Sequence, residues 1–219
     1  MRKILITIAL ASLSTLTYAA DFTLFSPEIK ANSMMPKSFE FNGFGCSGEN
    51  KSPALKWSGA PKDTKSFAVT MYDPDAPTGS GWWHWVVINI PADVSELAAN
   101  AGALNSTTLP KGAVQGRTDF GAAAWGGTCP PQGDKPHRYI FTVYALKTDK
   151  IDVPADATAA LTGYMIHGNM LGKASFTAKY GRASNRNALE RRCPRRLFHA
   201  LLPTRTSALP HNTHATSEP

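Results

Sequence analysis

The chain has 219 residues, and its formal net charge of +7 is unevenly distributed. Between residues 21 and 180, 14 Lys and Arg residues balance 14 Asp and Glu residues, whereas residues 181–219 hold seven Arg and two Glu. The central part therefore lacks a basic stripe of the kind that binds a phosphate backbone, and we expect no nucleic-acid partner. Its length is enough for one domain with a sizeable core, which we place at residues 20–180.

Residues 1–19 have the pattern of a secretory signal peptide. A charged start, MRK, precedes the apolar run ILITIALASL, and the small-residue exit TYA follows it. The apolar run is too short to span a bilayer comfortably, and no later segment approaches the ~20 apolar residues that a membrane helix needs. We therefore expect cleavage after Ala19 and a soluble mature protein that is periplasmic or secreted.

Strand signals dominate the central part. Short β-rich runs, separated by Gly, Pro, Asn and Asp clusters, predict strands at Phe22–Phe25, Ala54–Trp57, Ser66–Tyr72, Trp83–Ile90 and Arg138–Leu146. This spacing favours antiparallel sheets packed as a sandwich. The fold class predicted from the residues is therefore mainly β.

One helix is predicted near the end of the central part, from about Thr158 to Leu171. Its apolar residues are spaced to share one face, and they are Leu161, Tyr164, Met165 and Leu171. Gly163 and Gly168 weaken the helix, so that it has to rely on tertiary packing.

Residues 181–219 combine breakers and scattered charge without sustained periodicity, which predicts a disordered basic tail. Two interpretations stay open for this tail. It docks on an acidic lipid or polymer, or it is an appendage without a selected role, such as out-of-frame sequence.

Two of the three cysteines lie in Gly-rich loops of the central part. Cys46 stands in FGCSG and Cys129 in GGTCPP, while Cys193 falls in the tail. In an exported protein Cys46 and Cys129 are candidates for a disulfide, and the alternative is two separate buried thiols. Neither cysteine belongs to a CxxC or zinc-ligand pattern, so we expect no metal site and no cofactor.

Three ionisable side chains stand at strand ends on otherwise apolar faces. Side chains alternate along a strand, so Asp73 shares parity with Met71, His84 with Val86, Ile88 and Ile90, and His137 with Tyr139. Unpaired polar groups there would be costly, which favours mutual hydrogen bonds or a ligand. Each residue by itself can be explained as a histidine at a strand edge or an aspartate in a turn. The occurrence of all three together predicts a small polar pocket.

Two segments carry a resemblance to a known family. DPDAPTGSGWWHWVVINIP and CPPQGDKPHRYIFTVYAL resemble the signature segments of the phosphatidylethanolamine-binding protein family. The similarity is to its bacterial YbhB/YbcL-type branch, also called Raf kinase inhibitor-like, and most of all to its exported YbcL type. It extends in order and spacing over roughly residues 22–180, including KSPALKWSG and LPKGAVQGRTDFG.

The resemblance implies a two-sheet antiparallel Greek-key sandwich with a short C-terminal helix, few peripheral helices and a shallow anion pocket at one end. It implies that phosphate-like head groups bind to the matching positions, which are Asp73, Asp75, His84, Pro131, His137 and Tyr139. The family's chain normally stops near Tyr180, so residues 181–219 depart from its pattern.

These residues account for binding better than for catalysis. A protonated His84 or His137 pairs with a phosphate oxygen, Tyr139 donates its hydroxyl, and Asp73 holds an imidazole in one tautomer. The chain has no GxSxG elbow, P-loop or HExxH motif, so no enzyme is predicted.

The function expected is therefore an exported protein that binds a small phosphate-containing anion in this pocket. Two alternatives stay open: an inhibitor or modulator of a protein target, acting through the surface, and a hydrolase that uses the Asp and His residues. The partners considered are a small anionic ligand, a protein target and a second copy of the chain.

Overall fold

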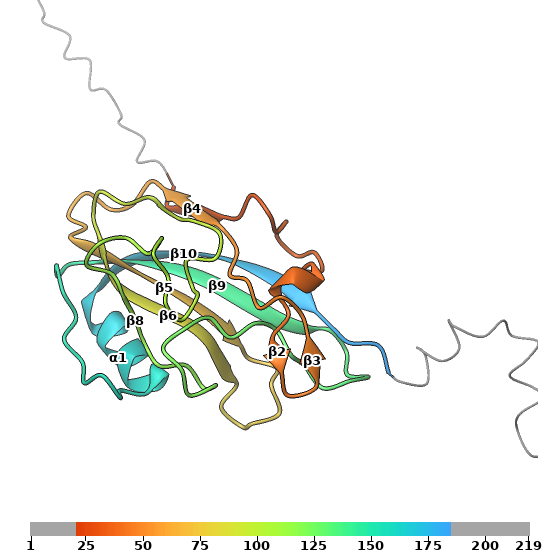
Figure 1. The fold of residues 1–219 in the computed structure, drawn as a ribbon. Helices are drawn as coiled ribbons and strands as arrows, with labels where there is room; N and C mark the ends of the chain where they lie inside the picture. Colours follow the sequence, from red (N-terminus) through yellow and green to blue (C-terminus); the bar gives the residue numbers. More distant parts are fainter. Residues whose placement is uncertain (1–20, 185–219) are drawn as a thin grey trace, which may run out of the picture.

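The structure is a computed structural model that describes residues 21–184. The predicted signal peptide and nearly all of the predicted tail, including Cys193, lie outside the described residues. A five-stranded antiparallel sheet forms the centre of the fold (Figure 1). Its order is β10-β9-β5-β6-β8, and these strands are Met170–Tyr180, His137–Leu146, Ser66–Asp73, Trp82–Pro91 and Val114–Gln115.

A smaller sheet covers one face of the central sheet. It has the order β1-β4-β7, with bounds Thr23–Phe25, Leu55–Ser58 and Glu96–Leu97. Between the two sheets lies the main core, in which Trp57 of β4 packs against Phe67 of β5 with ring centroids 5.5 Å apart. The predicted mainly β, two-sheet antiparallel sandwich is therefore confirmed.

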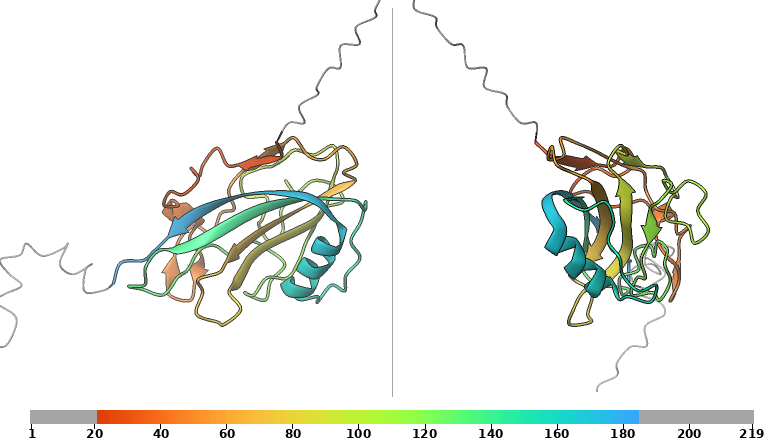
Figure 2. Two further views of the ribbon diagram at one scale, coloured as in Figure 1. Left: turned by 180° about the vertical axis from the view of Figure 1, so that it is seen from behind. Right: turned by 90° about the vertical axis from the view of Figure 1, so that its left-hand side faces the viewer.

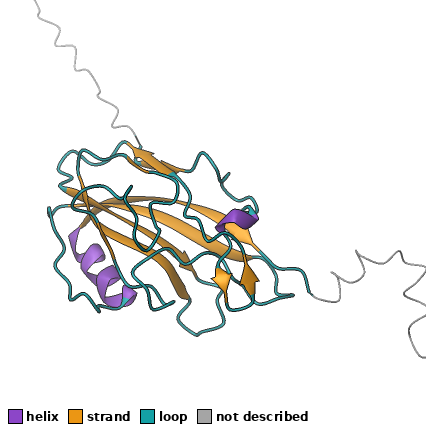
Figure 3. Ribbon diagram, viewed as in Figure 1, coloured by secondary structure: helices purple, strands orange, loops and turns teal. Residues whose placement is uncertain are grey.

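The other face of the central sheet packs against helix α1, Ala159–Asn169, as Figure 2 shows. Loops connect most of the strands, and the only other helix of residues 21–184 is the 3-10 turn Lys37–Phe39 (Figure 3). A short hairpin of β2 (Asn42–Gly43) and β3 (Cys46–Ser47) lies beside the end of β10 (Figure 1).

All five predicted strands are present, each within one residue of its expected bounds. Strand β10 was not predicted, because glycine, alanine and lysine give it a weak β signal. Its alternation is nevertheless clear in the structure, where Ala174, Phe176, Ala178 and Tyr180 are buried. The outer edge of β10 is covered near its end, because the backbone of Lys179 exchanges hydrogen bonds with Ser33 and Met35.

Helix α1 begins where it was predicted, but its expected buried face is wrong. Thr158 caps the helix by accepting a 3.1 Å hydrogen bond from the backbone N–H of Leu161. The buried residues are Ala159, Thr162, Gly163 and Ile166, whereas Leu161 and Tyr164 are exposed. Apart from Ile166, the residues of this contact face are small and let the helix approach the sheet, and Trp83 lies next to Gly163.

Candidate functional site

A pocket of about 290 Å3 opens at the end of the central sheet where β5 finishes. Because β6 and β9 are antiparallel neighbours of β5, their first residues lie beside Asp73, the last residue of β5. The lining residues are Phe44, Asp73, Ala76, Pro77, Thr78, Trp82, His84, Phe120, Cys129, Pro130, Pro131, His137 and Arg182. Four of the six residues expected at the site therefore line one cavity.

Asp73 and His137 form a buried pair in this pocket. Oδ2 of Asp73 lies 2.8 Å from Nδ1 of His137, and the two residues are 2% and 5% exposed. Oδ1 of Asp73 accepts a 2.8 Å hydrogen bond from the backbone N–H of Asp75. Since both carboxylate oxygens are occupied, Asp73 serves to orient the imidazole of His137. Nε2 of His137 lies 3.5 Å from Oδ2 of Asp134, whose side chain is 48% exposed, so a ligand that binds this nitrogen has to displace that carboxylate.

His84 reaches the pocket through a β-bulge. Tyr72 pairs with Trp83 and Met71 pairs with Trp85, so His84 is an extra residue between two pairs of the ladder. Its ring lies against Tyr139 at a centroid distance of 5.2 Å, on the main-core side of the sheet. The expectation that His84 shares a face with Val86 and Ile88 is wrong, because these two residues pack on the α1 side.

The carbonyl groups of a glycine pair determine the tautomer of His84. Nδ1 of His84 lies 2.7 Å from the carbonyl oxygen of Gly126 and 3.1 Å from that of Gly127, so Nδ1 carries a hydrogen and donates it. A Cβ atom at Gly126 would lie 2.2 Å from the ring of Phe120, and one at Gly127 would lie 2.3 Å from the carbonyl oxygen of Phe39. Only glycines allow this close approach of the backbone.

Burial lowers the pKa of His84 below its ordinary value of 6.5. The hydrogen bond to the carbonyl of Gly126 and the charge of Asp73 act in the opposite direction and do not overcome the burial. His84 is therefore neutral at pH 7, with Nε2 as a hydrogen-bond acceptor. From the sequence we expected His84 to become protonated near pH 6.5, but its lowered pKa means that protonation requires a lower pH.

Tyr139 and Asp75 lie outside the lining of the pocket. Tyr139 is fully buried behind His84, and its hydroxyl has no hydrogen-bond partner among residues 21–184. Burial raises the pKa of Tyr139, and the negative charge of Asp73 adds to the effect. Its hydroxyl is therefore a neutral donor close to the pair of Asp73 and His137.

The carboxylate of Asp75 turns away to Arg138. It lies 2.7 Å from Nη2 and 2.9 Å from Nε of that guanidinium, and it accepts a 2.8 Å hydrogen bond from the backbone N–H of Arg138. These contacts lower the pKa of Asp75 to about 2, with the side-chain hydrogen bonds from Arg138 as the largest cause. Asp75 thus ties the loop after β5 to the start of β9 rather than contacting the cavity.

An aromatic wall that the sequence analysis missed forms one side of the pocket. Phe120 contacts Phe44, Trp82 and His84, with ring centroids 5.9, 5.4 and 5.3 Å apart respectively. Phe44 is 76% exposed and has a left-handed backbone with φ of 51°, which is uncommon for a bulky residue. The alternation of strands gave no signal for Phe44 and Phe120, because both lie in loops.

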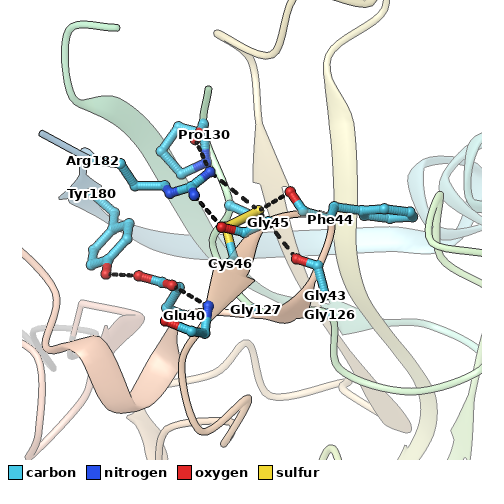
Figure 4. The surroundings of a disulfide bond; sticks show 12 residues. Glu40, Gly43, Phe44, Gly45, Cys46, Gly126, Gly127, Pro130, Tyr180 and Arg182 are labelled. Atoms are coloured by element: carbon cyan, nitrogen blue, oxygen red, sulfur yellow. Dashed lines mark hydrogen bonds between the residues drawn. A yellow bond between two sulfur atoms is a disulfide. The ribbon is translucent and has the colours of Figure 1, made fainter. Parts of the chain in front are cut away.

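The disulfide between Cys46 and Cys129 lies on the same side of the pocket (Figure 4). It joins β3 to the loop before β9, with a Cα–Cα distance of 5.9 Å, and so the predicted bridge is present. Glu40 supports this region, since it accepts a 2.7 Å hydrogen bond from the backbone N–H of Ser47 and another from the hydroxyl of Tyr180 (Figure 4). The bridge and Glu40 together fix the hairpin beside the pocket.

Within residues 21–184, no group of three or more His, Cys, Asp or Glu side chains is arranged to hold a metal ion. None of the helices in this range has the length and apolar character needed to cross a membrane. The polar side chains that line the pocket are those of Asp73, His137, His84, Thr78 and Arg182, set against apolar walls.

Two proteins of Escherichia coli (strain K12) are close relatives of the chain. The UPF0098 protein YbcL is 54% identical over 180 residues, which cover 82% of this chain and 98% of YbcL. The UPF0098 protein YbhB is 48% identical over 157 residues, 72% of this chain and 98% of YbhB.

Solved structures show the same fold. The crystal structure of E. coli YbcL, described as a new member of the mammalian PEBP family, matches with a TM-score of 0.72 and 57% identity. The match covers 74% of this chain and 99% of that chain. A PEBP homologue from Chlamydia trachomatis matches with a TM-score of 0.61 and 28% identity, over 74% of this chain and 97% of that one. The family model described as phosphatidylethanolamine-binding protein matches residues 25–181, and the chain therefore belongs to the phosphatidylethanolamine-binding protein family.

Proposed function

We propose that the pocket binds a small phosphate-type anion, either free phosphate or the phosphate of a lipid head group. The observation that carries this proposal is the meeting of Asp73, His84 and His137, from three strands, in one concave cavity. Nε2 of His84 is not used in the hydrogen bonds to Gly126 and Gly127, which leaves it to face a ligand oxygen in the cavity. The apolar walls around these groups strengthen any hydrogen bond formed there.

The proposal assigns a different role to each residue expected at the site. His84 and His137 contact the ligand through their Nε2 atoms, and Asp73 orients His137. Pro131 shapes the wall, Tyr139 supports His84 from behind, and Asp75 positions the loop after β5. No residue is assigned a catalytic role.

Binding of phosphate should be accompanied by proton uptake. Nε2 of His84 and a phosphate oxygen form a hydrogen bond only if a proton lies between them: a protonated imidazole donates to the phosphate, or a protonated phosphate donates to Nε2. The charged and titratable groups around His84 are Asp73 and Asp119, which favour its protonation, together with Tyr139 and His137. Affinity should therefore increase as the pH falls below about 6.5, for as long as the ligand keeps a negative charge.

We also propose that the protein is exported to the periplasm or the medium. The support is the signal-like pattern of residues 1–19 together with the disulfide, since disulfides persist in oxidising compartments. Fractionation of cells and sequencing of the mature N-terminus test this. Cleavage after Ala19 is expected, and an uncleaved cytosolic chain would contradict it.

Calorimetric titration tests the binding proposal. Inorganic phosphate and phosphorylethanolamine are titrated into the wild-type protein, His84→Ala and His137→Ala at pH 5.5 and 7.5. Loss of a charge-assisted hydrogen bond should cost about 1.5–3 kcal/mol of binding free energy in each variant. His167→Ala is the matched control, because His167 lies on α1 outside the pocket.

The outcomes separate the ligand sources and the alternatives. Similar affinities for both ligands indicate recognition of the phosphate alone, and tighter binding of phosphorylethanolamine indicates recognition of a lipid head group. If the wild-type protein binds neither ligand at either pH, the pocket is not an anion site and a surface interaction with a protein target becomes the better hypothesis.

A further inference from the structure

Arg182 reaches the pocket from beyond the last strand. Tyr180, two residues earlier in the chain, is buried in the main core and donates a hydrogen bond to Glu40. The extended chain continues past Tyr180, so the side chain of Arg182 points to the same side, toward the pocket and the disulfide (Figure 4). The carbonyl oxygen of Arg182 accepts a 2.9 Å hydrogen bond from the backbone N–H of Gly133, which fixes this segment.

The guanidinium of Arg182 bridges the two loops that the disulfide joins. Nη1 donates to the carbonyl oxygen of Pro130 at 3.2 Å, and Nη2 donates to that of Gly45 (Figure 4). Nη1 also lies 3.9 Å from the sulfur of Cys129. Gly45 and Pro130 are the sequence neighbours of Cys46 and Cys129, so the disulfide sets the spacing of the two carbonyls that hold the guanidinium.

This cation has no partner of opposite charge. No carboxylate of residues 21–184 forms an ion pair with Arg182, and the one acid that lines the pocket, Asp73, is engaged by His137. A guanidinium has five N–H groups, and the carbonyls and the sulfur account for three of them at most. The N–H of Nε and one N–H of Nη2 therefore remain for a ligand.

We propose that Arg182 is a ligand-contacting residue that supplies the permanent positive charge of the pocket, and that the Cys46–Cys129 disulfide positions its guanidinium. This inference rests on the proposed function and identifies the charge that makes the pocket select an anion. The histidines supply charge only when protonated, whereas a guanidinium stays charged at every relevant pH. Arg182 thus makes anion binding possible at neutral pH, where His84 is uncharged.

The test compares two substitutions that remove the same charge. Arg182→Gln removes the pocket cation. Arg117→Gln is the matched control, because Arg117 lines a separate cavity beside α1 and forms none of the ion pairs found within residues 21–184. Inorganic phosphate is titrated by calorimetry at pH 7.5 and two salt concentrations. Arg182→Gln should weaken binding by about tenfold or more and reduce the salt dependence, and Arg117→Gln should stay within about twofold of the wild type.

Arg182→Lys separates charge from folding. Lysine keeps the charge but cannot bridge both carbonyls, so its affinity should fall between those of the wild type and Arg182→Gln. If Arg182→Gln does not fold, the salt dependence of a folded Arg182→Lys variant decides: phosphate binding that does not change with salt concentration would contradict the inference.

Failure of the inference differs from failure of the proposed function. If the wild type binds phosphate and Arg182→Gln binds it equally well, Arg182 is not a ligand residue and the histidine site stands alone. If the wild type does not bind phosphate at any pH, both the pocket function and the role of Arg182 are refuted.

Discussion

Both oxygens of Asp73 accept hydrogen bonds, one from Nδ1 of His137 and one from the backbone N–H of Asp75, each at 2.8 Å. Because both carboxylate oxygens accept a hydrogen bond, no other side chain of this size can replace Asp73 without losing one of them. An asparagine can present only one oxygen, so its amide group would face one of the two donors and leave that donor unsatisfied. The pair therefore holds the loop after β5 and the imidazole of β9 in one arrangement.

Asp73→Asn should lower the free energy of unfolding by about 1–3 kcal/mol, the cost of one buried donor without a partner. Urea denaturation at pH 7 measures it. Asp152→Asn is the control, because the side chain of Asp152 is 86% exposed in its pair with Lys150 and should contribute little. Equal stability of the wild type and Asp73→Asn would show that Asp73 does not organise the site.

His84 should make the protein less stable in mild acid. Its pKa is lowered in the folded state, so the unfolded chain binds a proton first as the pH falls below 6.5, and unfolding becomes easier. His84→Asn keeps a side-chain donor toward the carbonyl of Gly126 but cannot titrate. Its stability should fall less than that of the wild type between pH 7 and pH 5.

Urea unfolding curves at several pH values measure this difference, with His167→Asn as the control for an exposed histidine. The acidic neighbours Asp73 and Asp119 and the second pocket histidine, His137, are common to the wild type and the His84 variant. Parallel pH profiles for the wild type and His84→Asn would refute the role of His84 as the acid-sensitive group.

The ion pair of Asp75 and Arg138 should contribute stability that acid removes. The pKa of Asp75 is lowered to about 2, so its contribution is fully present above pH ~4 and is lost as the pH falls toward 2. Because the side chains are 30% and 56% exposed, solvent screening limits the contribution to about 1 kcal/mol.

Asp75→Asn should therefore be less stable than the wild type at pH 6, and the difference should shrink near pH 2. Thermal unfolding at both pH values checks this, with Glu96→Gln as the control for the more exposed pair of Lys56 and Glu96. A difference that stays constant across the pH range would mean that the hydrogen-bond geometry matters and the charge does not.

Loss of the disulfide should destabilise the protein and also weaken phosphate binding. The bridge spans 83 residue positions, which corresponds to about 4 kcal/mol in the chain-entropy model. Replacing Cys46 and Cys129 by serine should lower the thermal midpoint. At a temperature where the variant is folded, its affinity should fall between those of the wild type and Arg182→Gln, because the guanidinium keeps its charge but loses its fixed carbonyls.

A double-mutant cycle between the cysteine variant and Arg182→Gln measures the coupling. The two losses of affinity should not add. Full additivity would mean that the bridge and Arg182 act independently. Peptide mapping of the exported protein provides the prior check, since recovery of both thiols in free form would contradict the bridge itself.

Much of the fold could be predicted because bulky β-branched and aromatic residues are typical of strands and give a clear local signal. The positions of Asp73 and His137 followed from alternation, since both lie at the ends of regular strands. The sequence also predicted that His84 lies near Asp73 and His137, but from a regular alternation that β6 does not follow. A bulge depends on how two strands pair, and the sequence of one strand does not show it.

The remaining features depend on contacts between distant segments. Phe44 and Phe120 meet across 76 positions, and Arg182 contacts Gly45 across 137. No local pattern indicates these contacts, and the resemblance to the family implied none of the three residues. The face of α1 was misjudged because Ile166 and three small residues pack against the sheet, whereas Leu161 and Tyr164 are exposed.

The most direct test of the central claim is a titration of the wild-type protein with inorganic phosphate, followed by long-range proton–nitrogen NMR spectra of its histidine rings. The account predicts that the Nε2 signals of His84 and His137 shift with phosphate, that Nδ1 of His84 remains protonated, and that His167 does not respond. Unchanged signals for both pocket histidines, or a response at His167 alone, would contradict an anion site at the end of the central sheet.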